Sequence, residues 1–177
     1  MTDETTNNML FSTSHFYVTI ASDSDESFFV SLLTDPITMG CIEKPLSQCE
    51  AIERFNKELI SLNQPKPRSL LWVITRKSDS SKVGLVGIAQ RKVFEDGWEL
   101  GVILSKESID QGIAKEVITG LVDKILGKIG ISRLYGRVKH NNQISIAMVT
   151  SLGFDNYKND PDYGYWVYEK KRTGDKF

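Results

Sequence analysis

Residues 98–140 change their hydrophobic period twice, and this change constrains the fold more than any other feature. Hydrophobic residues recur at the spacing of one helical face over residues 113–129, and Gly130 ends that pattern. The flanking segments, 97–105 and 133–140, have the composition of β-strands. A strand, a helix and a strand in this order form a crossover unit that joins two parallel strands. The sequence therefore predicts an α/β fold with a parallel strand pair.

The remaining segments predict helices near the N-terminus, an antiparallel meander in the middle and a closing hairpin. In chain order they are a strand over 15–22, a helix from Ser24 to Pro36, a helix over 46–62, strands over 69–77 and 82–93, a helix over 142–153 and a hairpin over 154–171. Ser47 and Glu50 form an S-x-x-E capping box at the start of the second helix. The predicted class is α/β, with a mixed, mostly antiparallel sheet and about four helices.

A chain of 177 residues is long enough to bury one sizeable core, so residues 1–177 are expected to form a single domain. Residues 1–13 are largely polar and are predicted to be an N-terminal arm. They lack the basic-then-apolar order of a secretory signal, and no apolar run is long enough for a membrane span. We therefore expect a cytoplasmic protein without a membrane partner.

The charge and the cysteines restrict the partners further. A net charge of -1, with scattered basic residues, gives no positive field to attract a nucleic acid. Cys41 and Cys49 do not form a CxxC motif, and His15 and His140 are near neither of them in sequence. We therefore expect no metal site and two reduced thiols that are buried or half-buried.

Three short stretches occur in an order that is typical of one family. WELGVIL (98–104) is similar to the family's fourth strand, and IDQGIA (109–114) to its pyrophosphate loop, usually Q/R-x-x-G-x-G/A. NQISIAMVTSLGF (142–154) is similar to its N-x-x-S…L-G-F signature. The chain thus resembles, over residues 15–171, the GNAT superfamily of acyl-CoA N-acyltransferases. Within it, the chain looks most like the branch that contains ribosomal-protein N-terminal acetyltransferases.

This resemblance implies acetyl-CoA as the cosubstrate and a sheet whose central parallel strands splay apart. In the family, the pantetheine arm lies in that gap, where strand backbone groups bond its amides. A helix N-terminus with unpaired N–H groups suits the diphosphate, and a glycine lets the backbone approach it. The residues assigned to acetyl-CoA in this way are Val102, Ile103, Leu104, Gln111, Gly112, Ile113, Ala114, Asn142 and Ser145.

The phosphate loop departs from the family pattern at two positions. Ile109 stands where the family has Gln or Arg, and Asp110 places a negative charge where the diphosphate is expected. Ser108-x-x-Gln111 is itself a capping box, so the stretch can also be explained as a helix start without a ligand. A Ser108 cap would use one N–H group and leave others free, so both interpretations are compatible.

The resemblance also indicates candidates for catalysis. Ser145 matches the signature serine, whose hydroxyl would reach the CoA sulfur, and the alternative is a buried serine bonded to its own helix. Val149 takes the place of a tyrosine that many members use as a proton donor. Glu99 is the leading candidate for the general base, unless it faces outward, because a bulge expected in this strand obscures its direction. His140 is a second candidate, and Asn142 either bonds the pantetheine arm or caps its helix.

Two functions remain open at this point. The first is an N-acetyltransferase that moves the acetyl group to a primary amine by direct attack in a ternary complex. That amine could belong to a protein N-terminus, a polyamine or a small molecule. The second is a non-catalytic acyl-CoA-binding module. The acceptor is expected between the first two helices and the hairpin, whose acidic and aromatic residues suit a cation or simply form a polar turn. A homodimer is compatible with either function.

Overall fold

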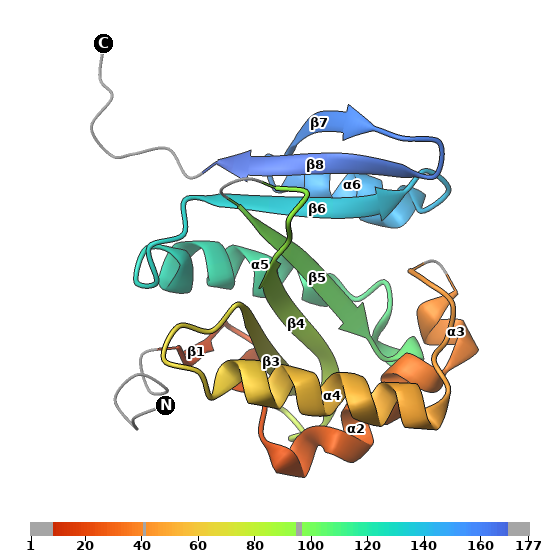
Figure 1. The fold of residues 1–177 in the computed structure, drawn as a ribbon, viewed down its shortest axis with the longest axis vertical. Helices are drawn as coiled ribbons and strands as arrows, with labels where there is room; N and C mark the ends of the chain where they lie inside the picture. Colours follow the sequence, from red (N-terminus) through yellow and green to blue (C-terminus); the bar gives the residue numbers. More distant parts are fainter. Residues whose placement is uncertain (1–8, 41, 95–96, 170–177) are drawn as a thin grey trace.

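An eight-stranded mixed sheet forms the centre of the protein, in a computed structural model that describes residues 9–40, 42–94 and 97–169 (Figure 1). The strands are β1 (Phe11–Ser12), β2 (Phe16–Ile20), β3 (Ser69–Arg76), β4 (Lys82–Gln90), β5 (Trp98–Leu104), β6 (Arg133–Lys139), β7 (Asp155–Asn159) and β8 (Tyr163–Glu169). Their order across the sheet is β1-β2-β3-β4-β5-β6-β8-β7. Every neighbouring pair is antiparallel except β5 and β6. The predicted α/β class and mostly antiparallel sheet are confirmed.

The described residues contain five α-helices, where about four were expected. They are α2 (Glu26–Thr34), α3 (Pro36–Met39), α4 (Gln48–Leu62), α5 (Ile113–Leu121) and α6 (Gln143–Ser151). The short α3 was not predicted, because Pro36 was taken only as the end of the preceding helix. Pro36 instead occupies the first position of α3, where the lack of an N–H group costs nothing, and the Asp35 side chain accepts the Ile37 N–H. The capping box of Ser47 and Glu50 is confirmed at α4.

The start of α2 differs from the predicted start at Ser24. A 3-10 turn, η1 (Asp23–Asp25), precedes the helix, and the Ser22 N–H donates to Asp25 Oδ2 at 2.8 Å. Lys82 Nζ of β4 lies 2.6 Å from Asp25 Oδ1 and ties this turn to the sheet. Burial raises the pKa of Asp25, but the hydrogen bonds from Lys82 and Ser22 outweigh it, so the pKa lies below its ordinary value.

The predicted polar arm over residues 1–13 is corrected at its C-terminal end. Residues 1–8 lie outside the described part of the chain. Met9 and Phe11 are buried, and β1 pairs with β2 through Phe11 and Val18. Trp72, itself fully buried, donates its ring N–H to the Met9 carbonyl at 2.9 Å. This segment therefore belongs to the edge of the sheet.

Helices cover both faces of the sheet (Figure 1). On one face, α2 and α4 pack together through Phe29 and Phe55, whose ring centroids are 5.0 Å apart. On the other face lie α5 and α6, and α5 continues into a π-helical turn, η3 (Val122–Leu126). Cys49 of α4 is exposed, so the expectation of a buried or half-buried thiol is wrong there, while Cys41 lies outside the described residues.

The parallel contact between β5 and β6 is short. Residues 98–100 of β5 pair with residues 134–136 of β6, and the ladder stops there. Both strands continue, to Leu104 and Lys139, without pairing to each other. The predicted splay of the central strands is therefore confirmed. The bulge expected in β5 is not found, because the β4–β5 register runs from one end to the other without a shift.

Candidate active site

The gap between β5 and β6 exposes backbone groups of β5. The Ser105 N–H donates to the Val83 carbonyl, so the backbone of Ser105 faces β4. Because successive residues of a strand direct their N–H and C=O groups to opposite sides, Ile103 also faces β4. Val102 and Leu104 face the gap instead. Of the three strand residues predicted at this place, Val102 and Leu104 thus offer backbone groups to a ligand, and Ile103 lines the cavity without doing so.

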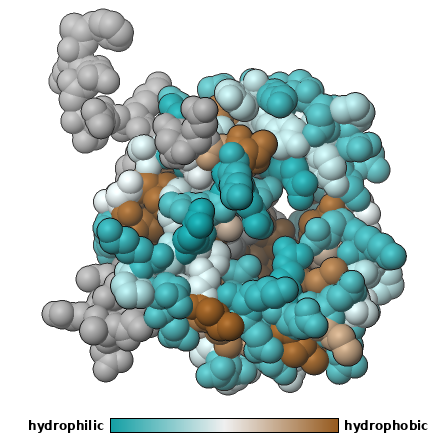
Figure 2. Space-filling model, viewed as in Figure 1, coloured by the Kyte–Doolittle hydropathy of each residue, from teal (hydrophilic) through white to brown (hydrophobic). Residues whose placement is uncertain are grey.

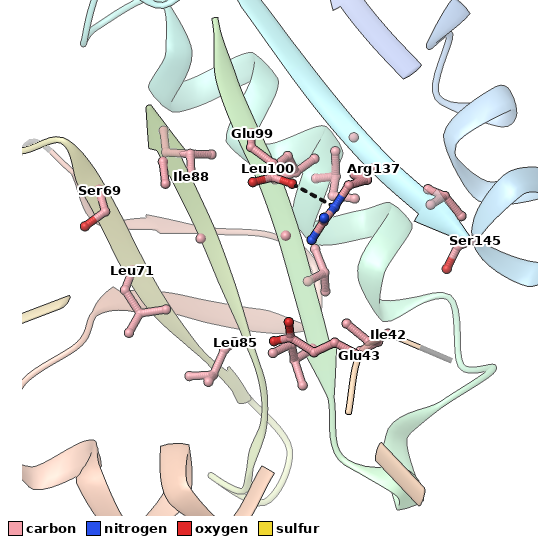
Figure 3. A pocket seen from close by; sticks show the side chains of 18 of the residues that line it. Ile42, Glu43, Ser69, Leu71, Leu85, Ile88, Glu99, Leu100, Arg137 and Ser145 are labelled. Carbon is pink, nitrogen blue, oxygen red and sulfur yellow. Dashed lines mark ion pairs between the residues drawn. The ribbon is translucent and has the colours of Figure 1, made fainter. Parts of the chain in front are cut away.

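A cavity of about 240 Å³ crosses the sheet at this gap, lined by residues from both faces. Figure 2 shows the hollow on the face that carries α4, with hydrophilic surface around it. Figure 3 shows Glu99 of β5 and Arg137 of β6 pointing toward each other across the gap, with Ser145 of α6 beside β6. The cavity therefore connects the α6 side of the sheet to the α4 side through the sheet itself.

The N-terminus of α5 begins at a glycine rather than at a serine cap. Gly112 has a left-handed backbone (φ 72°), and no side chain caps the first turn of the helix. The predicted capping box is therefore wrong: Ser108 is buried, and its Oγ accepts a hydrogen bond from Ser105 Oγ at 2.9 Å. Ile113 and Ala114 occupy the first two helical positions, so their N–H groups have no intrahelical partner. Asp110 is exposed and also left-handed (φ 64°), which aspartate tolerates better than most residues.

Gln111 is fixed by two contacts, one of which comes from a residue not predicted from the sequence. Its Nε2 donates to the Glu107 carbonyl at 2.6 Å, and its Oε1 accepts from Arg76 Nη2 at 2.9 Å. Arg76 ends β3 and is also 3.5 Å from Asp79. A guanidinium group thus stands beside the loop in which Ile109 provides no polar side chain. No local pattern indicates this contact, because 35 residues separate the two partners.

Ser145 and Asn142 sit at the start of α6, where the signature places them. The Asn142 side chain accepts the Ser145 N–H at 3.0 Å, so Asn142 does cap the helix. Ser145 lines the cavity and is half-buried rather than buried, and within the described residues it hydrogen-bonds through its backbone N–H and not through its hydroxyl. The alternative of a bond back to its own helix is therefore not found. Val149 is buried and packs beside Gly136 of β6.

Glu99 points into the cavity from β5, but it is not free. Its Oε2 accepts from Arg91 Nε at 2.9 Å. Its Oε1 lies 3.5 Å from Arg137 Nε, and Figure 3 marks this ion pair with a dashed line. Its side chain is 19% exposed, whereas those of Arg91 and Arg137 are 52% and 44% exposed. The arrangement is a half-buried carboxylate between two more exposed guanidinium groups. Glu99 is thus an inward-facing residue, and the outward-facing alternative is wrong.

His140 and most of the hairpin lie outside the cavity. The His140 Nε2 is 2.8 Å from the Asp160 carbonyl, in the turn between β7 and β8. Asp160 also accepts from the Tyr165 hydroxyl, and this bond lowers the pKa of Asp160 and raises that of Tyr165. Among the described residues of the hairpin, only Tyr163 lines the cavity, and Arg137 lies 4.7 Å from its ring centroid. Most of the acidic and aromatic residues expected around an acceptor therefore lie outside the cavity.

Charged residues near α4 complete the cavity, and they were not predicted. Arg54 of α4 forms an ion pair with Glu43 at 2.6 Å, and Glu58 lies one helical turn further along α4. Their amphipathic helix pattern gives no sign that a cavity faces them. Among the described residues, no group of three or more His, Cys, Asp or Glu could hold a metal ion. Within the same ranges, no helix is long and apolar enough to cross a membrane.

The fold and the split sheet define a class of acyl-transferring domains, and sequence comparison identifies it. Residues 18–155 match the family described as "Acetyltransferase (GNAT) domain". The chain therefore belongs to the GNAT acetyltransferase family, a family of enzymes. It is 27% identical over 122 residues to "Uncharacterized N-acetyltransferase YjdG" of Bacillus subtilis (strain 168), covering 69% of this chain and 72% of that protein. A second Bacillus subtilis (strain 168) relative, "Uncharacterized N-acetyltransferase YoaA", is 24% identical, over 84% and 88% of the two chains.

Solved structures share the same fold. The spermidine N-acetyltransferase from Vibrio cholerae, in complex with CoA and spermine, has a TM-score of 0.74. The match covers 89% of this chain and 96% of that chain at 17% identity. At this identity the likeness supports the arrangement of strands and helices, and the acceptor has to be inferred from the residues of the cavity.

Proposed function

We propose that the protein transfers an acetyl group from acetyl-CoA to a primary amine within a ternary complex. The observation that carries this proposal is the cavity at the end of the β5–β6 ladder, which joins the α6 face to the α4 face. A thioester and an amine that enter from opposite faces would meet in the gap. A module that only binds acyl-CoA would have no need of the charged end near α4, so the cavity favours an enzyme over the non-catalytic alternative.

The cosubstrate would lie along the gap and end at α5. The outward backbone groups of Val102 and Leu104 would bond the pantetheine amides in the manner of an added strand. The diphosphate would bind the N–H groups at the start of α5, where Gly112 lets the backbone come close. Arg76 would offset the charge of Asp110 by holding Gln111 and by adding a cation beside the loop.

The amine nitrogen would attack the thioester carbon, forming a C–N bond while the C–S bond breaks. The N–H of Val102 or Leu104 would stabilise the oxyanion, because both point into the gap. The Ser145 hydroxyl, which has no partner among the described residues, would donate a hydrogen bond to the leaving sulfur. Val149 at the usual tyrosine position cannot donate a proton, so Ser145 carries this role alone on α6.

The amine proton would leave through Glu99. Arg91 holds Oε2 at 2.9 Å, whereas the contact of Arg137 with Oε1 is longer, at 3.5 Å. Oε1 is therefore the oxygen that can accept the proton, directly or through a water molecule.

The homodimer, the cytoplasmic location and the branch with ribosomal-protein N-terminal acetyltransferases stay predictions from the sequence.

Two measurements test the proposal. Acetyl-CoA should raise the melting temperature of the protein, and CoA thiol should be released when primary amines are added. Binding of acetyl-CoA without thiol release on amino acids, peptides and polyamines would favour the binding module. Lack of any binding would refute the assignment of the gap and of the α5 N-terminus to CoA.

A further inference from the structure

The end of the cavity that faces α4 has more cationic than anionic residues. The cations are Arg54, Arg91, Arg137 and Lys139, and the anions are Glu43, Glu58 and Glu99. Arg54 is already neutralised by Glu43, so the excess lies at β6, where Arg137 and Lys139 project from the same face of the strand. An acceptor with several positive charges, such as a polyamine, would be repelled there. The cavity instead favours an acceptor that carries a negative charge beside its amine.

Glu99 and Arg137 show where that negative charge would bind. The Glu99 carboxylate contacts two guanidinium groups, those of Arg91 and Arg137, through the Nε of each. Each guanidinium group has five N–H donors in total. Arg137 makes no other hydrogen bond or ion pair within the described residues, and its stacking on Tyr163 leaves its edge accessible. The remaining donors of Arg137 form a planar fork that suits a carboxylate in a bidentate geometry.

The spacing of this pair limits the acceptor further. Glu99 Oε1 and Arg137 Nε are 3.5 Å apart, so a ligand that satisfies both must carry opposite charges within a few ångströms of each other. An α-amino acid has this arrangement, with its amine next to its carboxylate. A diamine has two like charges at a greater separation.

We infer that the acceptor is an α-amino acid whose carboxylate binds Arg137 while its amine lies beside Glu99. This inference rests on the proposed N-acetyltransferase function and names its acceptor class. The amine would reach the thioester from the α4 face, with the carboxylate fixed to β6. Acetylation would then remove the positive charge of the acceptor and leave an N-acetyl amino acid with a net negative charge.

Thiol release from acetyl-CoA tests this inference with acceptors that differ only at the carboxylate. Phenylalanine, phenylalaninamide and phenethylamine form one set, and lysine and cadaverine form another. We expect kcat/KM to be at least about tenfold higher for phenylalanine than for phenylalaninamide or phenethylamine, and for lysine than for cadaverine. The amide has the more easily deprotonated amine, so intrinsic reactivity would favour the amide. Equal or higher kcat/KM for phenylalaninamide and cadaverine would overturn the inference.

Two arginine variants on β6 locate the effect. Arg137→Gln should bring the ratio of kcat/KM for phenylalanine over phenethylamine close to one. Arg133→Gln is the matched control, because Arg133 lies on the same strand but pairs with Glu169 at 2.6 Å and does not line the cavity. It should keep the ratio of the unmodified protein. An unchanged ratio in Arg137→Gln, or a collapsed ratio in Arg133→Gln, would contradict the role of Arg137.

A binding measurement separates failure of this inference from failure of the proposed function. If acetyl-CoA binds but none of these amines causes thiol release, the proposed acetyl transfer to them is refuted. The carboxylate site is then tested separately, by measuring how each compound changes the melting temperature of the CoA-loaded protein. Stabilisation by phenylalanine but not by phenylalaninamide, lost in Arg137→Gln, would still support a carboxylate site. No stabilisation by phenylalanine, or equal stabilisation by both compounds, would overturn it.

Discussion

Replacing Gly112 by alanine tests the phosphate site most sharply, because the chain contains a matched glycine elsewhere. Gly112 and Gly130 both have φ of 72°, and at both positions an added Cβ would meet no atom within 4 Å. Only Gly112 begins α5, whereas Gly130 follows its last turns. The two substitutions therefore impose the same backbone strain at different distances from the proposed ligand.

The expected loss of stability is the same for both variants. A left-handed backbone costs an L-residue roughly 1–2 kcal/mol, and the reduced freedom of the unfolded chain returns roughly 0.4–1 kcal/mol. Gly112→Ala and Gly130→Ala should each lower the free energy of unfolding by about 1 kcal/mol. For a domain of this size, that corresponds to a decrease of about 2–4 °C in melting temperature.

The affinity for CoA should separate the two variants. In Gly112→Ala the new methyl group would stand where the loop backbone approaches the diphosphate, and a loss of about 1.4 kcal/mol raises the Kd tenfold. Gly130→Ala should bind CoA like the unmodified protein in isothermal titration calorimetry. Pantetheine lacks the diphosphate, so its affinity should be the same in both variants. Equal CoA affinity in the two variants, or an equal loss for pantetheine and CoA in Gly112→Ala, would refute the phosphate site.

Three further substitutions test other parts of the molecule. Ser145→Ala should lower kcat about tenfold or more with little change in the Kd of acetyl-CoA. The control Ser151→Ala, on the exposed side of α6, should leave kcat unchanged. An unchanged kcat in Ser145→Ala would exclude the Ser145 hydroxyl from the mechanism. Glu99→Gln should abolish the acidic limb of the pH–rate profile, and a limb that persists would exclude Glu99 as the base. Lys82→Met should lower the melting temperature near neutral pH. Because the folded-state pKa of Asp25 lies below the ordinary 3.8, this stabilisation is present above 3.8 and is lost as the pH falls through the folded-state pKa. If the melting temperatures of Lys82→Met and the unmodified protein differ by the same amount well below that pKa, Lys82 stabilises the fold by packing and not through its ion pair.

The elements of the fold could be predicted wherever one period dominates a long segment. The amphipathic pattern of residues 113–129 and the strand patterns beside it are found at the expected places, because burial on one face fixes each period. Short elements were less predictable. β1 has two residues and depends on burial of Met9 and Phe11 in the tertiary structure, and α3 has four residues set by Asp35 and Pro36.

The site was predictable where local sequence alone decides it. Gly112 and Asn142 lie at the starts of α5 and α6, as the local pattern predicts, because their own backbone or the first helical turn decides these positions. The capping box failed because Ser108 is buried and bonds Ser105, a competing local partner that the S-x-x-Q pattern does not consider. Arg76 and the charged residues of α4 reach their places through contacts between distant segments. A single sequence contains no signal for such contacts.

The short β5–β6 ladder also has a mechanical consequence. Three residue pairs join the segment from β6 to β8 to the rest of the sheet, and beyond them Val102 and Leu104 pair with β4 but have no partner in β6. A cosubstrate that fills the gap would cross-link the two halves of the sheet through its own amides. Loading with acetyl-CoA would then stiffen the hinge between these halves, and departure of CoA would loosen it again, so that each turnover includes a cycle of tightening and release.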